Sequence, residues 1–170
     1  MKVLQVSGTD KMGGAGIAAY RLHEGLAQSD IESHMLVSRK ATSDPTVHRL
    51  LPRMNRLQRL QTRYASRRYT NQLKQHPRKS DSAYWSLNNS SYPIAEQINS
   101  FNADIVHIHW VGDNYLPIQQ FAKINAPIIW TLHDMWAFTG GCHYSGDCQA
   151  YQTGCGNCPQ LMNPLPYDIS

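Results

Sequence analysis

The sequence lacks the features that would place the chain across a membrane or outside the cell. None of its apolar runs approaches the roughly 18 residues of a membrane-spanning helix. The N-terminus, MKVLQVSGTD, has one lysine and a short apolar run that ends at Ser7 and Gly8. A signal peptide would have an apolar core of roughly 7–15 residues and a small-residue cleavage site. We therefore expect a cytoplasmic protein, with a single domain over residues 1–170.

Acidic side chains are missing from residues 49–79, although this segment holds ten of the sixteen lysines and arginines and the net charge is +4. Within it, Met54, Leu57, Leu60 and Tyr64 recur every three or four residues, which predicts an amphipathic helix. The other face of this helix carries arginines: Arg53, Arg56, Arg59, Arg63 and Arg67. Such a helix is typical of one that lies on anionic lipid headgroups, peripherally on the inner face of the plasma membrane.

Two other interpretations of the basic segment stay open. Nucleic acid is the competing anion, but the sequence has no zinc finger, aromatic RNA-binding sheet or helix-turn-helix pattern, so we expect no nucleic acid. The segment can also be a solvated helix face without a partner.

Four short segments rich in β-forming residues alternate with helical patterns. They are VLQVSG, HMLVSR, DIVHIHW and PIIWTLHD, which begin at residues 3, 34, 104 and 127. This alternation predicts an α/β fold, a Rossmann-like parallel sheet of four strands flanked by helices. Because ligands bind at the carboxyl ends of such strands, the ligand-binding residues should lie within residues 7–16, 107–110 and 133–136.

Three glycines, Gly13, Gly14 and Gly16, open the first helix just after the first strand. Free backbone N–H groups at a helix N-terminus suit a phosphate. GAGIAA also fits the GxGxxA pattern of dinucleotide-binding domains, but four residues separate these glycines from the strand. The second strand ends in Ser38 and Arg39 rather than in an acid, so an NAD(P) oxidoreductase is disfavoured. The plain alternative is a flexible turn that lets the helix pack closely.

Histidines mark the ends of the third and fourth predicted strands. His107 and His109 face the same side of their strand, and His133 and Asp134 follow the last strand. A histidine at this edge can accept a proton or bind a sugar or a phosphate. The alternative, a hydrogen bond inside the core, is favoured for His107, and both roles stay open for His109 and His133. Asp134 either orients His133 or caps the next turn.

Cysteine is absent except in one stretch, residues 140–160, which we name the cysteine loop. The spacing C-x5-C-x6-C-x2-C is that of Cys142, Cys148, Cys155 and Cys158, with His143 as a reserve ligand. Its CGNC half is common in four-cysteine zinc sites, so we expect a structural zinc that orders the loop. Disulfides, which a reducing cytosol disfavours, and ordinary thiols are the alternatives. A redox CxxC would start a helix, whereas here Pro159 follows.

Three stretches together resemble a known family. They are MKVLQVSGTDKMGGAGIAAYRLHEGL, DIVHIHWVGDNYLP, and PIIWTLHDMWAFTGGCHYSGDC with GCGNCPQL. They are similar to the N-terminal half of retaining GT-B glycosyltransferases, and more narrowly to family 4 enzymes of bacterial exopolysaccharide and O-antigen assembly, of the colanic-acid type. The resemblance covers nearly the whole chain, is weakest across residues 40–90, and is most specific at HDMWAFTGGCHY with the cysteines that follow.

The resemblance implies an enzyme of hexosyltransferase type and a role for each of its domains. In the family, this domain binds the acceptor, commonly a lipid-linked saccharide at the membrane. A second domain binds the nucleotide-sugar donor, and no catalytic metal is expected. The resemblance assigns roles to individual residues as follows: Gly13, Gly14 and Gly16 to the donor phosphates, His133 and Asp134 to catalysis, His109, Trp110 and Trp136 to the acceptor, and the basic helix to membrane docking.

The chain departs from the family in having no second nucleotide-binding half and no paired-glutamate motif. We therefore expect a fragment of a longer enzyme that cannot transfer sugar alone. The alternative is a non-enzymatic, zinc-containing α/β binding domain that docks on an anionic membrane or on nucleic acid.

Overall fold

A computed structural model describes residues 1–51, 54–80, 84–89 and 92–170. In this part of the chain, five parallel strands form one sheet in the order β3-β2-β1-β4-β5. In chain order, the strands are β1 (Lys2–Thr9), β2 (Glu32–Arg39), β3 (Val47–Arg49), β4 (Ile105–Ile108) and β5 (Ile128–Trp130). The parallel α/β fold is confirmed, but the expected number of four strands is wrong. The sequence analysis missed β3 because three residues show no periodicity.

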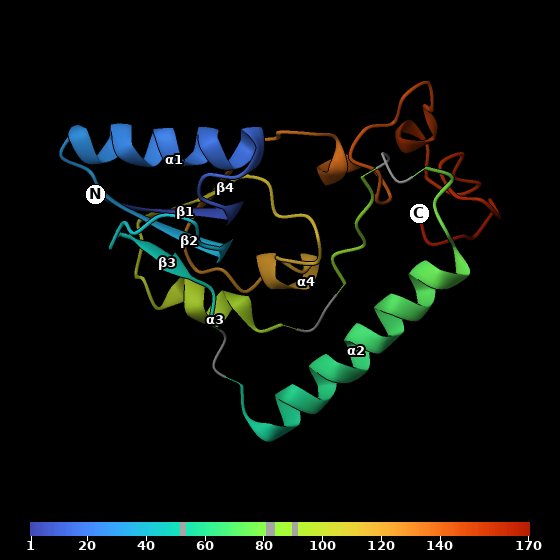
Figure 1. The fold of residues 1–170 in the computed structure, drawn as a ribbon, viewed down its shortest axis with the longest axis horizontal. Helices are drawn as coiled ribbons and strands as arrows, with labels where there is room; N and C mark the ends of the chain where they lie inside the picture. Colours follow the sequence, from blue (N-terminus) through green and yellow to red (C-terminus); the bar gives the residue numbers. More distant parts are fainter. Residues whose placement is uncertain (52–53, 81–83, 90–91) are drawn as a thin grey trace.

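The central strand β1 is buried from Val3 to Thr9 because it is covered on both faces. Helix α1 (Gly13–Gln28) lies on one side of the sheet, and α3 (Ile94–Asn99) and α4 (Ile118–Phe121) lie on the other (Figure 1). Tyr20 of α1 packs with Met35 and Val37 of β2, whereas Ile94 and Ile98 of α3 pack with Leu4 and Val6 of β1. These two apolar cores hold the glycine turn, and the strand ends around it, in fixed positions.

Several elements are shorter than the sequence pattern predicts. The sequence YLPIQQFAKIN at residues 115–125 has a helical pattern, but only Ile118–Phe121 is helical. The last strand ends at Trp130 rather than at residue 134. Strand β4 ends at Ile108, so His109 and His133 both lie beyond their strands. Their side chains are therefore carried by loops at the carboxyl edge of the sheet.

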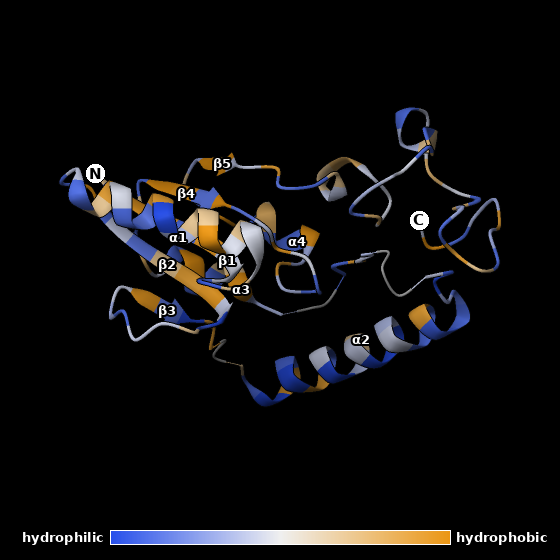
Figure 2. Cartoon of the chain, turned by 45° about the horizontal axis from the view of Figure 1, so that its top comes forward, coloured by the Kyte–Doolittle hydropathy of each residue, from blue (hydrophilic) through white to orange (hydrophobic). Residues whose placement is uncertain are grey.

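Helix α2 (Arg56–Gln75) begins with a capping box, in which the Asn55 side chain accepts from the Gln58 N–H and the Gln58 side chain accepts from the Asn55 N–H. It stands away from the sheet in two views, and its surface is mostly hydrophilic (Figures 1 and 2). Thr62 is its buried residue. Within the described residues, no helix is long and apolar enough to cross a membrane.

The apolar residues of α2 correct one expectation from the sequence. Leu57, Leu60 and Tyr64 were expected on a face opposite the arginines, but all three are exposed, at 64%, 62% and 66%. Successive residues of a helix are turned by about 100°, so this apolar stripe lies directly beside Arg56, Arg59, Arg63 and Arg67. Arg53, the remaining arginine of the predicted face, lies outside the described residues.

The chain beyond β5 forms two short 3₁₀ helices, Trp136–Phe138 and Ala150–Gln152, and otherwise irregular structure. It pairs with the segment that follows α2, through backbone bridges between Arg78 and Leu161 and between Trp85 and Cys142. The Lys79 N–H also donates to the Gln160 carbonyl at 2.9 Å. The cysteine loop therefore anchors the C-terminal end of α2.

Candidate active site

A cleft of about 600 Å³ opens at the carboxyl edge of the sheet. Its walls come from the ends of β1 and β2, the start of α1, and the loops after β4 and β5. The structure thus brings the three glycines together with the His133–Asp134 pair, as a ligand spanning both would require. The lining residues are Ser7, Thr9, Met12, Gly13, Gly14, Ala15, Gly16, Arg39, Tyr84, Trp110, Asp113, His133, Asp134, His143 and Tyr144.

Residues 13–16 form the glycine loop, which contains three glycines and Ala15. Two of these glycines are required for different geometric reasons. Gly13 has a φ of +68°, a left-handed conformation that other residues seldom adopt. A Cβ on Gly16 would lie 2.3 Å from the Thr9 Oγ1, so only glycine lets α1 approach β1 this closely. The first turn of α1 has no acidic residue and no side-chain cap at Met12. Its N–H groups and positive dipole end are therefore available to an anion in the cleft.

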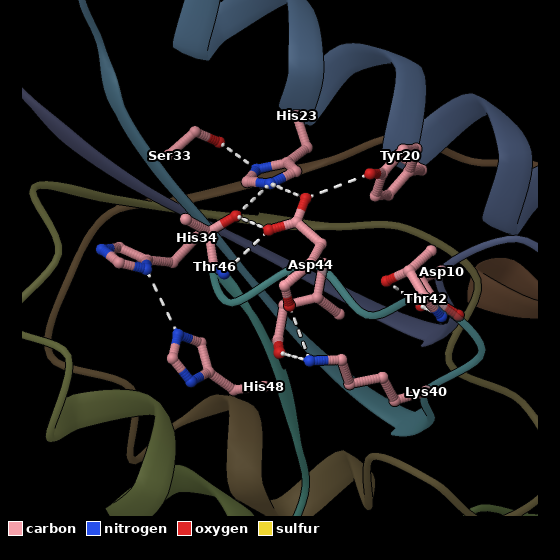
Figure 3. A network of polar contacts seen from close by, with 11 residues as sticks. Asp10, Tyr20, His23, Ser33, His34, Lys40, Thr42, Asp44, Thr46 and His48 are labelled. Atoms are coloured by element: carbon pink, nitrogen blue, oxygen red, sulfur yellow. Dashed lines mark hydrogen bonds and ion pairs between the residues drawn. The ribbon is translucent and has the colours of Figure 1, made fainter.

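A buried carboxylate fixes the turn that carries the glycine loop. Asp10 is fully buried and accepts hydrogen bonds from the Ala41 N–H at 2.8 Å and from the N–H and Oγ1 of Thr42, each at 2.8 Å. Burial raises the pKa of Asp10, but these donors outweigh it, and the pKa is lowered overall. Asp10 stays ionised and ties the β1–α1 turn to the loop after β2 (Figure 3).

A second polar network lies beneath α1 and supports its packing on the sheet (Figure 3). His23 is hydrogen-bonded to the Ser33 Oγ at 2.8 Å and to the Thr46 Oγ1 at 2.9 Å, and the Tyr20 hydroxyl donates to Asp44 at 3.0 Å. Burial lowers the pKa of His23, more than the charge of Asp44 raises it. This network is remote from the cleft lining, so we assign it to structure.

A chain of hydrogen bonds supports His133 from below. The Nε2 of His109 lies 2.7 Å from the Gln5 Oε1, and its Nδ1 lies 3.0 Å from the His133 Nε2. Since Oε1 can only accept, His109 carries its proton on Nε2 and its Nδ1 accepts from the His133 Nε2–H. Among the described residues, none hydrogen-bonds the Nδ1 of His133, which is therefore left for a ligand. Burial and the neighbouring histidines lower the pKa of His109 to about 3, and burial lowers that of His133.

Asp134 is held by a chain that the sequence did not indicate. Its Oδ2 accepts from the Nδ1–H of buried His143 at 2.5 Å, and the Ser86 Oγ lies 2.9 Å from the other ring nitrogen. The Trp110 indole nitrogen lies 3.2 Å from the same His143 Nδ1, and Trp110 also lowers the pKa of Asp134. Burial raises the pKa of Asp134, but the bonds from His143 and the Trp136 N–H lower it overall. Ser86 is fully buried, so this Ser-His-Asp chain orients Asp134 rather than forming a nucleophile.

Not all of the predicted acceptor contacts reach the cleft. Trp110 lines it, but Trp136 is 7% exposed, belongs to the apolar core, and donates from its indole N–H to the Ser86 carbonyl at 2.7 Å. His109 is buried one layer below the cleft, behind His133. His107 is half-buried and bonded to the Thr131 Oγ1 at 2.7 Å. Trp136 and His109 therefore do not line this cleft, but both border a smaller pocket that His133, Asp134 and Trp110 also line.

Other lining residues were missed because no motif marks them. Arg39 and Asp113 face each other at 3.8 Å, and Tyr84 and Tyr144 line the cleft from irregular segments. The sequence indicates His143 only as a reserve metal ligand. Its adjacency to Cys142 is the sequence signal for that role, and nothing in its spacing indicates Asp134 as a partner.

All four cysteines line a second, much smaller cavity of about 20 Å³. They are free thiols, and burial raises the pKa of Cys142 and Cys158. Among the described residues, no three histidine, cysteine, aspartate or glutamate side chains lie close enough together, in their present rotamers, to hold a metal ion. His143 faces Asp134 and Ser86 instead of this cavity.

The sequence profile described as Glycosyltransferase Family 4 matches residues 12–152, which include the glycine loop, α2 and the His133–Asp134 pair. The chain belongs to glycosyltransferase family 4. The family resemblance of the sequence is thereby confirmed, together with the parallel α/β fold that it implied.

One relative of this family 4 chain is a protein of Escherichia coli strain K12 named as a colanic acid biosynthesis glycosyl transferase, WcaC. It is 34% identical over an aligned stretch of 71 residues, and the match covers 38% of the chain and 17% of WcaC. The match thus spans much less than two thirds of the relative's length. No solved structure matches the chain.

Proposed function

We propose that this chain is the acceptor-binding half of a retaining glycosyltransferase. The enzyme would move a sugar from a nucleotide-sugar to a lipid-linked or polysaccharide acceptor, at the inner face of the plasma membrane. The name of the WcaC relative supports a role in exopolysaccharide biosynthesis. In this proposal a second domain supplies most of the donor site, so the chain alone does not transfer sugar.

The observation that carries this proposal is the single cleft shared by the glycine loop and the His133–Asp134 pair. A nucleotide-sugar needs its phosphates bound and its sugar held a short distance away. The N-terminus of α1 offers N–H donors and a positive dipole end to the diphosphate. His133 lines the same cleft and can contact the sugar.

His133 contributes a neutral ring in this proposal. Its lowered pKa leaves it uncharged at neutral pH, and its Nε2–H is committed to His109. The unpaired Nδ1 can then accept a hydrogen bond from a hydroxyl of the transferred sugar. Asp134 does not contact the His133 ring, but its anion, fixed by His143, stabilises positive charge that develops nearby in the transition state.

Helix α2 is the proposed membrane-docking element. Its exposed leucines and tyrosine lie beside the arginine face, so a single orientation places the apolar side chains among acyl chains and the arginines among anionic headgroups. A solvated helix would gain nothing from three exposed large apolar residues. A lipid-linked acceptor would then be presented on the same side as the docked helix.

The test is turnover of the full-length enzyme that contains this chain, with UDP- and GDP-sugars and a polyprenyl-diphosphate-linked saccharide. Replacing His133 by Ala should lower kcat by about 100-fold or more, because it removes a group positioned at the reacting sugar. The matched control is His107→Ala, since His107 belongs to the same row of histidines but does not line the cleft. Equal turnover of the two variants would contradict the proposal.

The chain alone gives a second test. It should show no transfer with the same donors, because one wall of the cleft cannot hold the donor through the reaction. Turnover by residues 1–170 would refute the proposed division into two domains.

A further inference from the structure

The cavity formed by the cysteine loop is separate from the cleft and is not explained by sugar transfer. All four cysteines of the chain line this cavity, although sixteen positions separate Cys142 from Cys158. Neither His133 nor the glycine loop contributes to its lining. Four thiols that meet around one small space, with no other cysteine in the chain, suggest a common ligand.

The backbone around two of these sulfurs has the form of a metal-binding turn. In the CGNC turn, Gly156 has a φ of 132° and Asn157 a φ of 51°, so the chain reverses tightly between Cys155 and Cys158. Such a turn lets both thiols face one point.

A backbone N–H group is aimed at one of these sulfurs. Gly140 donates to the Cys155 Sγ at 3.2 Å, whereas the Leu161 N–H donates to the carbonyl oxygen of Cys158 at 3.1 Å. A neutral thiol is a weak acceptor, whereas a metal-bound thiolate is a strong one. The Gly140 N–H therefore fits a thiolate at Cys155 better than a thiol.

The loop also has little else to stabilise it. Residues 139–170 contain one 3₁₀ turn, Ala150–Gln152, and most of their side chains are exposed or half-buried. Cys158 and Leu161 are the buried apolar residues of this stretch. Burial on this scale contributes a few kcal/mol, which is small against the entropy of ordering some thirty residues. A bound metal would supply the missing free energy.

We propose that Cys142, Cys148, Cys155 and Cys158 ligate one structural Zn²⁺ ion. Four thiols lose their protons and the four sulfurs form a closed tetrahedral shell, with no position open for a reaction. Because the sulfurs do not converge in the structure as it stands, binding includes rotation of the thiols about χ1 into the cavity that they line. His143 is not a ligand, since both of its ring nitrogens are used by Asp134 and Ser86.

The ion would brace two parts of the molecule. Cys142 directly precedes His143, whose ring orients Asp134. Cys142 also forms a backbone bridge with Trp85, and the residue after Trp85, Ser86, is hydrogen-bonded to His143. The other end of the loop holds the segment after α2 through Leu161. The proposal stands on the cysteines alone and does not depend on sugar transfer.

The experiment measures metal content of the chain purified without chelators, by inductively coupled plasma mass spectrometry. We expect about one zinc per chain. Exchange of zinc for Co²⁺ should produce the intense visible and near-ultraviolet bands of tetrahedral cobalt thiolate. Removal of the metal from the wild-type chain with a chelator should lower the thermal midpoint and expose residues 140–160 to protease.

The variants are Cys155→Ser and Cys158→Ser, each expected to reduce bound zinc at least fivefold. Ser145→Ala is the control, because Ser145 lines the same cavity without supplying a thiol, and it should keep its zinc. The chelation arm uses the wild-type chain, so it decides the question even if a cysteine variant fails to fold. Four reactive thiols without metal, a mass lower by four hydrogens from two disulfides, or iron with sulfide in place of zinc would each overturn the proposal.

Discussion

Gly16 is one of the glycines whose substitution the structure makes costly. An added Cβ would lie 2.3 Å from the Thr9 Oγ1 and 3.0 Å from its carbonyl oxygen, so α1 would have to move away from β1. Gly25, in the same helix, is exposed and has no atom within 4 Å of such a Cβ. Substitution of Gly16 therefore tests the steric clash with Thr9, whereas substitution of Gly25 tests helix propensity alone.

We expect Gly16→Ala to lower the free energy of unfolding by about 1–3 kcal/mol, the usual cost of overpacking. Gly25→Ala should raise it by about 0.5–1 kcal/mol, because alanine favours the helix. Urea unfolding of the chain measures both. A stabilising effect at both positions would mean that the close approach of Thr9 is not a constraint.

His109 should make the stability of the chain depend on pH. Its pKa falls from 6.5 to about 3 on folding, because burial and two neighbouring histidines oppose its charge. Between these values the unfolded chain binds a proton that the native chain does not. The free energy of unfolding therefore decreases as the pH falls below about 6.5, by up to about 1.4 kcal/mol for each pH unit from this residue.

The test is the slope of unfolding free energy between pH 6.5 and about 5.5, above the range in which most carboxylates titrate. His109→Gln cannot titrate, so its slope should be shallower than that of the wild type, whatever its absolute stability. His23, His107 and His133 also have lowered pKa values and contribute to both slopes. Identical slopes would show that His109 is not shielded from protonation.

At the scale of the element, helix α2 combines two stripes with different partners. The arginine stripe attracts any polyanion. The exposed Leu57, Leu60 and Tyr64, in contrast, are stabilised only when they leave water for an apolar environment such as the acyl chains of a membrane. Membrane docking therefore predicts sensitivity to both stripes, and nucleic-acid binding predicts sensitivity to the arginines alone.

We expect the chain to sediment with vesicles of phosphatidylglycerol and phosphatidylcholine, and much less with phosphatidylcholine alone. Replacing Arg59 and Arg63 by Glu should abolish most of this binding, and Leu60→Ser should weaken it about tenfold, equivalent to about 1.4 kcal/mol. The charge-matched control replaces Arg21 and Lys123, which are exposed and outside α2, by Glu. If Leu60→Ser binds as the wild type does, the helix does not insert its apolar stripe.

At the scale of the whole molecule, His143 joins parts that are distant in the sequence. It directly follows Cys142 in the sequence. Its Nδ1 is hydrogen-bonded to Asp134 beside the cleft, and its Nε2 is hydrogen-bonded to Ser86 in the segment after α2. Each partner is at least half-buried, so loss of the ring would leave Asp134 and Ser86 with unsatisfied groups.

We expect His143→Ala to reduce the free energy of unfolding by about 2–4 kcal/mol, because two buried hydrogen bonds and a buried ring are lost. Tyr144→Ala, at the neighbouring and 65% exposed position, should change it by no more than about 0.5 kcal/mol. Thermal and urea unfolding of the two variants provide the comparison. Similar small effects would remove His143 as the link between the loop and the cleft.

The sequence by itself determined the parallel α/β fold, the family, and the edge of the sheet at which the cleft lies. It could do so because strand and helix periodicities are local, and because carboxyl ends of parallel strands meet at one edge. It failed at β3, at the lengths of α4 and β5, and at the exposed stripe of α2, where packing rather than local pattern decides the outcome.

Only the tertiary structure decided which side chains face the cleft. Trp136 and His109 belong to the right segments, yet burial against the core removes the first from the cleft and places the second behind His133. The bonds from His143 to Asp134 and Ser86 join three separate segments, so no spacing along the chain could indicate them. Such contacts depend on how loops cross in space, and that arrangement follows from the whole core rather than from any short stretch of residues.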